Sequence, residues 1–452
     1  MDQHAALSLS AAAPVADAPL TTARLRELVT GRLAQLREGE RLDPARLAER
    51  QQAALAVLAD HAARFSPGFA ARLDQAGLHA AQLGEPGALQ ALPPLTRSEL
   101  QAGDGVYAQA IPETHQPTHS IETTGSTGQP VRVVHTLVTQ VEWLALTLLE
   151  HAWHGSDFSR PLAAVRANAS QVQHLPDWGS AVRLVARSGP SAVIPGSLPM
   201  GEIFALLRAL DPGQLVIYPT ILATLCDHVE RSGEAPLRLQ RIRTIGEMLQ
   251  PERRERARAL LGAPVTDVYS SRELGQIAIE CPASGLYHAP ESLIVEVLDA
   301  EGMPCAEGAE GDVVVTALRN FATPLIRYAI RDRAIRGGPC PCGRGLPTLR
   351  RVMGRERNMV RMPGGGRAYP PLATGSFWQH GPVTQFQFIQ HAVDDIEVRL
   401  AVTRPATSQE EKALTAAIQT MLGHAFALRF SYFEQALPPA PGGKHEEFVC
   451  LC

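Results

Sequence analysis

The sequence lacks the features that would direct it to a membrane or to a nucleic acid. None of its apolar runs approaches the roughly 18 residues that a membrane-spanning helix needs. Blocks of like charge are also missing, and 42 basic side chains nearly balance 46 acidic ones. Binding to nucleic acid or to a membrane surface therefore has no electrostatic support. With 45% hydrophobic and 19% charged residues, the composition is typical of a soluble globular protein.

The N-terminal stretch lacks the positive charge that precedes the apolar part of a secretory signal. The Ala-rich segment from Ala5 to Ala13 follows Asp2, and the first basic residue is Arg24. We interpret residues 1 to about 20 as a loose tail. The seven cysteines are an odd number in a long chain without such a signal, which argues against a disulfide framework. These absences predict a cytoplasmic protein.

The length and the hydrophobic patterns predict more than one domain. A chain of 452 residues is too long for one ordinary core, and it has no internal repeat. Leu and Ala recur at helical spacing from Leu20 to Leu83 and again from Val138 to Trp153. Short apolar runs then alternate with helical stretches, which predicts a parallel sheet with covering helices. The strands are expected at 214–218, 242–245 and 264–269, and the helices at 220–231 and 251–261.

Beyond Ser292 the chain becomes richer in strand patterns, with segments at 293–298 and 312–316. The stretch from Gly354 to Pro371 holds four glycines and three prolines and indicates a boundary. The remainder, up to Cys452, has the size of a small α+β domain, with strands at 396–400 and 427–433 and a helix at 408–422. The predicted fold class is therefore α/β. It comprises a large N-terminal domain, 1–353, with parallel-type sheets, covering helices and a β-rich part, and a small mobile C-terminal domain, 354–452.

The strongest local signal is the segment Thr123-Thr-Gly-Ser-Thr-Gly128. Glycines permit close approach, so that backbone N–H groups and hydroxyl groups can converge on phosphate oxygens. The segment lacks the Lys of a Walker A loop. Taken alone, it could equally be a Ser/Thr/Gly surface loop. The residues of the predicted phosphate loop are Thr123, Thr124, Gly125, Ser126, Thr127 and Gly128.

Four further motifs come later in the chain, in a fixed order. They are Tyr269-Ser-Ser-Arg-Glu273-Leu-Gly275, Arg327-Tyr-Ala-Ile-Arg-Asp332, Gly354-Arg355 and Gly442-Gly-Lys444. With the phosphate loop, they make the chain resemble the adenylate-forming superfamily, within it the phenylacetate–coenzyme A ligases and their capsule-biosynthesis relatives. The resemblance covers nearly the whole chain. It includes Leu92-Pro-Pro-Leu-Thr-Arg-Ser-Glu-Leu100 and Thr323-Pro-Leu-Ile-Arg-Tyr328.

The resemblance implies a nucleotide site. The phosphate loop would hold the ATP phosphates, and Gly246-Glu247 would line the acyl and adenine pockets. Tyr269, followed by Ser270 and Ser271, would pack near the adenine. Asp332 would bind the ribose hydroxyls, and Arg355, beside a hinge near 355–358, would approach the ribose or a phosphate.

The resemblance also implies the catalytic groups. Glu273 would reach Mg²⁺, and Lys444 would contact the carboxylate and the α-phosphate. These roles fit the chemistry, because a carboxylate and a triphosphate must meet and positioned cations favour that encounter. The alternatives are that Glu273 and Asp332 are helix caps or surface carboxylates and that Lys444 is a solvated lysine.

The chain departs from the family pattern in three places. Ser270 and Arg272 stand where relatives have Gly and then Ser or Thr, and Arg331 replaces the wider superfamily's Gly. Arg357-Asn358 replaces an acidic pair after the hinge glycine and arginine. We predict that the Arg272 guanidinium faces the active site and acts in catalysis. The alternative is that it points into solvent or pairs with an acid such as Glu280.

A metal site is predicted from cysteine and histidine spacing. Cys281 and His288 flank the turn-forming Pro282-Ala-Ser-Gly285, and Cys340-Pro-Cys342 comes about fifty residues later. Three thiolates and one imidazole would complete a tetrahedral zinc shell. The short spacing between Cys340 and Cys342 leaves free thiols open. Some relatives carry Cys and His at these points, which favours a structural zinc.

The leading interpretation is ATP-dependent activation of a small carboxylic acid as its acyl-adenylate, followed by transfer to coenzyme A. An amide-forming or carrier-protein-loading ligase shares the first half-reaction and stays open. A third alternative is a nucleotide-binding, zinc-stabilised protein that has lost catalysis, against which Lys444 and Glu273 argue. ATP, Mg²⁺, structural Zn²⁺ and coenzyme A are the expected cofactors. The acid and the oligomeric state, including a homodimer, are left open.

Overall fold

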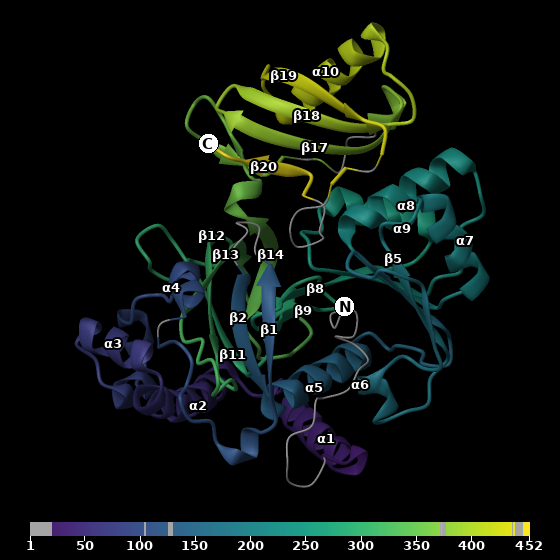
Figure 1. Ribbon diagram of the computed structural model, residues 1–452. Coiled ribbons are helices and arrows are strands. Elements are labelled where there is room, and N and C mark those ends of the chain that lie inside the picture. Colours follow the sequence, from purple (N-terminus) through teal and green to yellow (C-terminus); the bar gives the residue numbers. More distant parts are fainter. Residues whose placement is uncertain are drawn as a thin grey trace. The chain divides into compact units, whose positions relative to one another are not determined.

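Figure 1 presents the computed structural model of the chain. It describes residues 20–103, 105–124, 130–370, 372, 377–435, 437–438 and 446–452. Two compact units are present. The first comprises Met1–Leu162, His174–Ser191 and Thr266–Val352, and the second Ala163–Gln173, Ala192–Val265 and Met353–Cys452. The domain limits predicted from the sequence stay a prediction.

The first unit begins with the helices expected between Leu20 and Leu83. Each of the three long ones starts at a polar cap, because Thr21, Asp43 and Ser66 accept hydrogen bonds from the first free N–H groups. No described helix is long and apolar enough to cross a membrane. The helices here are α1 (Thr22–Gly39), α2 (Pro44–Phe65), α3 (Pro67–Ala76), α4 (Arg97–Ala102), and the short η1 (Ala80–Gly84), η2 (Ala88–Ala91) and η3 (Glu113–His115).

The predicted phosphate loop joins the strands of a hairpin. Strand β1 (Thr118–Thr124) pairs antiparallel with β2 (Pro130–Thr136), and Thr124 lies opposite Pro130. Helix α5 (Leu137–Trp153) comes directly after β2, with Thr136 as its cap. It packs its apolar face against α1, in a cluster that includes Val29, Leu36 and Leu144. The helix predicted at 138–153 is thus confirmed.

Seven strands of the first unit lie side by side in the order β11-β12-β13-β14-β10-β9-β8. They confirm the strands expected at 264–269, 293–298 and 312–316. Antiparallel pairing joins β8 to β9 and β11 to β12. Their bounds are β8 (Val265–Ser271), β9 (Gly275–Glu280), β10 (Tyr287–His288), β11 (Leu293–Leu298), β12 (Glu310–Ala317), β13 (Tyr328–Arg336) and β14 (Thr348–Arg355). The small α6 (Ser180–Arg183) also belongs to this unit.

The second unit contains the parallel sheet that the alternating pattern predicted. Its strands lie in the order β7-β6-β3-β5, and β6 and β7 pair in parallel. Apolar side chains of one face, among them Val165, Leu215 and Ile242, form a core with helices α7, α8 and α9. The elements are β3 (Leu162–Arg166), β5 (Ser191–Pro195), α7 (Met200–Leu210), β6 (Gln214–Ile217), α8 (Pro219–Ser232), β7 (Arg241–Ile245) and α9 (Pro251–Leu261). The short strand β4 (Gln173–Leu175) begins with the last residue of one segment of this unit and continues into the first unit.

The end of the chain forms a four-stranded sheet with one helix, which confirms the α+β character expected there. The strand order is β19-β18-β17-β20, and Phe388, Ile396 and Leu414 lie in its core. The elements are η4 (Glu356–Asn358), β15 (Val360–Arg361), β16 (Arg367–Ala368), η6 (Phe377–Gln379), β17 (Val383–Ala392), β18 (Asp395–Val402), α10 (Ser408–Leu422), β19 (Ala427–Phe433) and β20 (Phe448–Cys450).

Candidate active site

Glu273 lies beside the start of the predicted phosphate loop. Its Oε1 accepts a hydrogen bond from the Thr123 hydroxyl over 3.4 Å, although the two residues are 150 positions apart. The turn between β8 and β9 produces this placement. In it the Ser271 hydroxyl accepts from the Leu274 N–H, and Gly275 has a φ of 76° that favours glycine. Residues 125–129, which include Gly125, Ser126, Thr127 and Gly128, lie outside the described residues.

Arg97 is a site residue that the sequence did not reveal. Its Nη1 lies 3.1 Å from Glu273 Oε1, and the two side chains are only 11% and 9% exposed. Arg97 opens α4, where Thr96 and Glu99 form a reciprocal capping box. The pattern Thr-x-x-Glu could have located the helix start, but nothing in it points to Glu273. The Arg97 guanidinium thus offsets the charge of the Glu273 carboxylate in this buried place.

Tyr269 and Asp332 meet although they are 63 positions apart. The Tyr269 hydroxyl on β8 donates a 2.8 Å hydrogen bond to Asp332 Oδ2 on β13. The preceding residue, Arg331, has a φ of 66°, in the left-handed region. That conformation explains the glycine expected in the wider superfamily, because a side chain there carries strain. The pairing of β12 with β13 also shifts register around this position, between Asp312 and Val314.

Gly246 and Glu247 follow β7 in the second unit. Gly246 has a φ of 75°, and Glu247 Oε2 accepts a 2.9 Å hydrogen bond from the N–H of Thr220 in the first turn of α8. An anion in this place is favoured by the helix dipole. Arg355 ends β14 in the same unit, directly after Gly354, whose carbonyl accepts from the Tyr369 hydroxyl.

The residues that depart from the family pattern lie in defined surroundings. Arg272 is exposed, and its Nη1 donates to the Glu122 carbonyl on β1 over 3.4 Å. Ser270 lies opposite Gln276 in the β8–β9 pairing. Glu280, the proposed alternative partner of Arg272, is buried and accepts from the Asp267 N–H. The predicted role of Arg272 stays a prediction.

The predicted hinge contacts the end of the chain. Arg357 forms an ion pair with Glu446, and the Asn358 amide donates to the Phe448 carbonyl over 2.7 Å. Both bonds lie within the second unit and attach the hinge segment to β20. Lys444, the predicted catalytic lysine, lies outside the described residues.

The four predicted zinc ligands come together in the first unit. The ligand atoms of Cys281, His288, Cys340 and Cys342 all lie within 4.8 Å of one another. Cys281 Sγ is 3.8 Å from Cys340 Sγ, and His288 Nε2 is 3.4 Å from Cys342 Sγ. A tetrahedron with Zn–S bonds of about 2.3 Å has edges of roughly 3.8 Å between sulfurs and 3.6 Å between sulfur and nitrogen. The donor set therefore fits a zinc ion in size and in chemistry.

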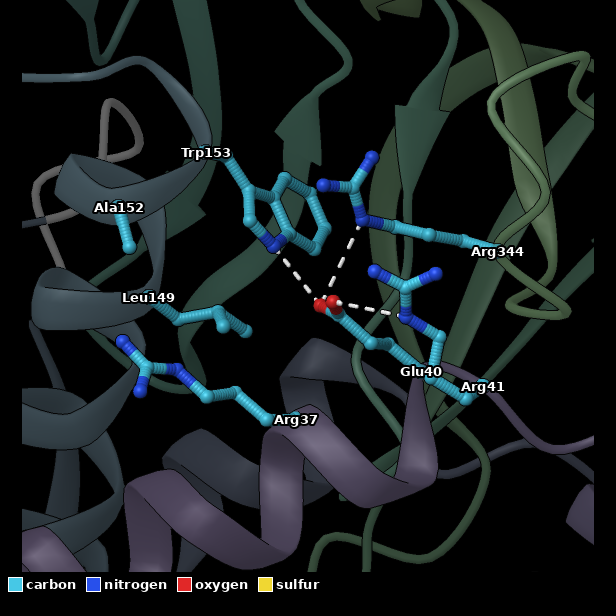
Figure 2. A pocket seen from close by; sticks show the side chains of 7 residues that line it. All are labelled: Arg37, Glu40, Arg41, Leu149, Ala152, Trp153 and Arg344. Atoms are coloured by element: carbon cyan, nitrogen blue, oxygen red, sulfur yellow. Dashed lines mark hydrogen bonds and ion pairs between the residues drawn. The ribbon is translucent and has the colours of Figure 1, made fainter.

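A second layer of side chains packs around this cluster. Figure 2 shows Glu40 with dashed contacts to Trp153, Arg344 and Arg41. The Trp153 ring meets the His288 ring edge-on at 5.6 Å, and the Arg344 guanidinium lies 4.0 Å from the centre of the Trp153 ring. Arg344 Nη1 also lies 3.9 Å from Cys281 Sγ. A zinc with three thiolates carries one negative charge, which this guanidinium would balance.

A cavity of about 320 Å³ lies between α1, α5 and the loop that contains Arg344 (Figure 2). It is lined by Arg37, Glu40, Arg41, Leu149, Ala152, Trp153 and Arg344. Gly345 comes very close to the end of α1, because a Cβ at Gly345 would overlap the Leu42 carbonyl oxygen. Its N–H donates to the Glu40 carbonyl over 3.0 Å. The segment with Cys340 and Cys342 is thus fixed against α1 by backbone as well as side-chain contacts.

Comparison with known proteins agrees with the motifs. The family model of the CapK C-terminal domain matches residues 374–449. The phenylacetate–coenzyme A ligase of Escherichia coli K12 is 25% identical over 321 residues, 67% of this chain and 70% of that protein. The corresponding enzyme of Aromatoleum evansii is 24% identical over 319 residues, 67% and 69% of the two chains.

The solved structures agree on the fold. A 2-hydroxyisobutyryl-CoA ligase in the postadenylation state superposes with a TM-score of 0.68 over 91% of both chains, at 17% identity. An anthranilate CoA ligase in complex with anthranoyl-AMP gives a TM-score of 0.52 over 72% of this chain and 65% of that one, at 14% identity. The resemblance inferred from the motifs is confirmed: the chain is a homologue of the phenylacetate–coenzyme A ligases, with the fold of the adenylate-forming enzymes and a CapK-type C-terminal domain.

Proposed function

We propose that this protein activates a carboxylic acid with ATP, releases pyrophosphate, and transfers the acyl group from the acyl-adenylate to coenzyme A. The observation that supports this most is the convergence of two pairs in one unit. Thr123 and Glu273 meet on the side of the phosphate loop, and Tyr269 and Asp332 meet where the family places adenine and ribose. These contacts join segments 150 and 63 positions apart. The relatives' activity and the fold agree with this assignment.

The first half-reaction needs positioned charge rather than a nucleophilic side chain. A carboxylate oxygen attacks the α-phosphorus, the new C–O–P linkage forms, and pyrophosphate leaves. Arg97 and Lys444 would offset the negative charge of the reacting groups, and Asp332 would hold the ribose. Mg²⁺ bound near Glu273 would neutralise the triphosphate. The carboxylate fits that role, since it is buried beside the Thr123 hydroxyl.

We also propose that Cys281, His288, Cys340 and Cys342 bind one structural Zn²⁺. Four protein ligands leave no open position for a substrate, so the ion would stabilise the fold rather than take part in catalysis. Arg344 and Trp153 would hold this site in place from outside. Use of ATP and coenzyme A agrees with the cytoplasmic location predicted from the sequence.

The acceptor has a second candidate. The hinge carries Arg357-Asn358 in place of the expected acidic pair, and these residues bond to Glu446 and Phe448. A changed hinge affects the domain rotation that prepares thioester formation, so transfer to an amine or to a carrier-protein thiol is the alternative. Both routes share the acyl-adenylate.

Acid-dependent exchange of labelled pyrophosphate into ATP tests the shared half-reaction. A panel of carboxylic acids should contain substrates that support exchange, and product analysis with coenzyme A, amines and carrier proteins should then give an acyl-CoA. A thioester on a carrier or an amide as main product would favour the second candidate. No exchange with any acid, from protein that binds ATP, would support loss of catalysis instead.

A further inference from the structure

Two thiols lie in contact beyond the last strand of the second unit. Cys450 is the last residue of β20, and Cys452 follows it after one intervening residue. Their Sγ atoms are 3.5 Å apart. Both thiols are free, Cys452 exposed and Cys450 half-buried. The other five cysteines differ from this pair, because three belong to the proposed zinc cluster and two, Cys226 and Cys305, are buried.

The pairing of β20 with β17 explains why the two thiols meet. Gln390 of β17 lies opposite Cys450, and its carbonyl accepts a 2.9 Å hydrogen bond from the N–H of Leu451. This bond continues the pairing past the end of β20. Alternate residues of a strand share one face, so the side chains of Cys450 and Cys452 project to the same side. The contact between the sulfurs is therefore built into the backbone.

The pair also lies close to the attachment of the predicted hinge. Gln390 is buried, and its side-chain amide exchanges two hydrogen bonds of 2.8 Å with the backbone of Arg361 on β15. Strand β20 holds the hinge segment as well, because its Phe448 carbonyl accepts from the Asn358 amide. A change at the two thiols thus occurs on the strand to which the hinge is bound.

The two thiols are suited to different roles. Cys450 Sγ donates a hydrogen bond to the main-chain oxygen of Cys452 over 3.4 Å. Burial raises the pKa of the Cys450 thiol, which the bond to the Cys452 main chain and the charge of Arg367 partly offset. Cys450 is thus held as a thiol, whereas the exposed Cys452 can be reached by a solute. An accessible sulfur attacks first, and a second sulfur in contact with it resolves the product.

We propose that Cys450 and Cys452 form a reversible redox site that reacts with low-molecular-weight disulfides. The Cys452 thiolate attacks one sulfur of the small disulfide and forms a new S–S bond. The other sulfur leaves as a thiolate with the bonding electron pair and takes up the proton that Cys452 lost. Cys450 then releases its proton and attacks Cys452 Sγ, which closes the intramolecular disulfide and releases the second small thiol.

The reaction is balanced, because the two protein thiols lose two electrons and two protons and the small disulfide becomes two thiols. An excess of small thiol reverses it by the same steps. Exposed disulfides are the labile kind that serve regulation, and transient ones of this kind occur in reducing compartments. The inference is independent of the proposed ligase activity, which uses neither cysteine.

Oxidised glutathione is the probe, applied to the full folded chain. Trypsin cleaves after Lys444, and the peptide 445–452 contains both thiols and no other cysteine. The parent peptide should lose two hydrogen atoms and carry little glutathione, and dithiothreitol should restore its reduced mass. In Cys450→Ser the reaction should stop at the glutathione adduct of Cys452. Cys452→Ser should form an adduct about 10-fold more slowly, since the remaining thiol is half-buried.

Cys226→Ser is the matched control. Cys226 lies on α8 of the same unit, and burial raises the pKa of its thiol to about 12, so this variant should form the disulfide as the parent does. Three results overturn the proposal: a lasting glutathione adduct on the parent peptide, disulfides between chains, or an unmodified peptide. The assay needs no acid, ATP or coenzyme A, so none of these results would count against the proposed ligase activity.

Discussion

The Tyr269 hydroxyl on β8 donates a 2.8 Å hydrogen bond to the carboxylate of Asp332 on β13. The bond fixes the direction of the Asp332 carboxylate. Because Tyr269 is only 7% exposed, its ring also provides a firm support for this geometry. In the proposed nucleotide site, the tyrosine would position the carboxylate and the aspartate would bind the ribose.

We expect Asp332→Asn to raise KM for ATP by about 10- to 100-fold, since hydrogen bonds to a charged group are lost. Tyr269→Phe preserves the ring and removes only the positioning bond, so it should raise KM less. Pyrophosphate exchange at varied ATP measures both, with thermal unfolding as the control for folding. An unchanged KM in Asp332→Asn would remove this residue from the nucleotide site.

Lys444→Ala should abolish adenylate formation and leave folding intact, because it removes the cation expected at the carboxylate and the α-phosphate. The chain offers a well-matched control. Lysine occurs at only two positions, and Lys412 lies on α10 of the same C-terminal part. Lys412→Ala should exchange pyrophosphate normally. Normal exchange by Lys444→Ala would show that the assigned role is wrong.

Glu273→Gln should weaken the binding of Mg²⁺. Half-maximal exchange should then need a higher concentration of the metal. The amide keeps the shape of the side chain but loses the charge that attracts the ion. Arg97→Gln tests the other half of the pair, which lies 3.1 Å away. It leaves a buried carboxylate without its partner and should lower stability by about 3 kcal/mol. A metal titration identical to the parent's in Glu273→Gln would contradict its role.

The chain should bind about one zinc through its Cys₃His cluster, since a closed shell contributes to folding directly. Stripping the metal should lower Tm more than it lowers affinity for ATP. Elemental analysis of protein purified without added metal gives the stoichiometry. Cys281→Ser should lose the ion, and Cys305→Ser, a buried thiol outside the cluster, should retain it. Seven freely titratable thiols in folded, zinc-free protein would refute the site.

Arg272→Ser restores the type of residue found in relatives, yet we expect it to reduce activity on the native acid. The expected loss is about 1–3 kcal/mol of transition-state stabilisation, the range for hydrogen bonds to charged groups. The guanidinium is exposed and contacts the Glu122 carbonyl on the strand that leads to the phosphate loop. Arg183→Gln, an exposed arginine of the same unit, is the control. Parent-like kcat/KM in Arg272→Ser would show that the substitution is tolerated.

The sequence predicted a helix or strand well where the residues of that one element were enough to define it. Helix α10 begins after Thr407 and ends before Gly423, and both ends were readable from capping chemistry. The zinc ligands were also readable, because cysteine and histidine are few and have a restricted chemistry. Strand direction was harder. The run at 264–269 was expected in a parallel sheet, but β8 pairs antiparallel with β9, which only the fold reveals.

Contacts between distant segments were beyond local patterns. The Arg97–Glu273 pair spans 176 positions, and no propensity or spacing links its members. The same holds for Thr123 and Glu273, which lie 150 positions apart. Arg331 is a different case. It looked like a departure from a motif, and its positive φ now gives the physical reason why relatives favour glycine there.

The Cys₃His cluster has a consequence for the unfolded chain. Cys281 and Cys340 are separated by 59 positions, and the segment between them contains β11, β12 and β13. A link across a loop of this length removes conformational entropy worth about 4 kcal/mol from the denatured ensemble. An ion captured early would hold the three strands within reach of one another before they pair. We therefore expect zinc supply during synthesis to govern the yield of folded protein, and metal added after misfolding to rescue little of it.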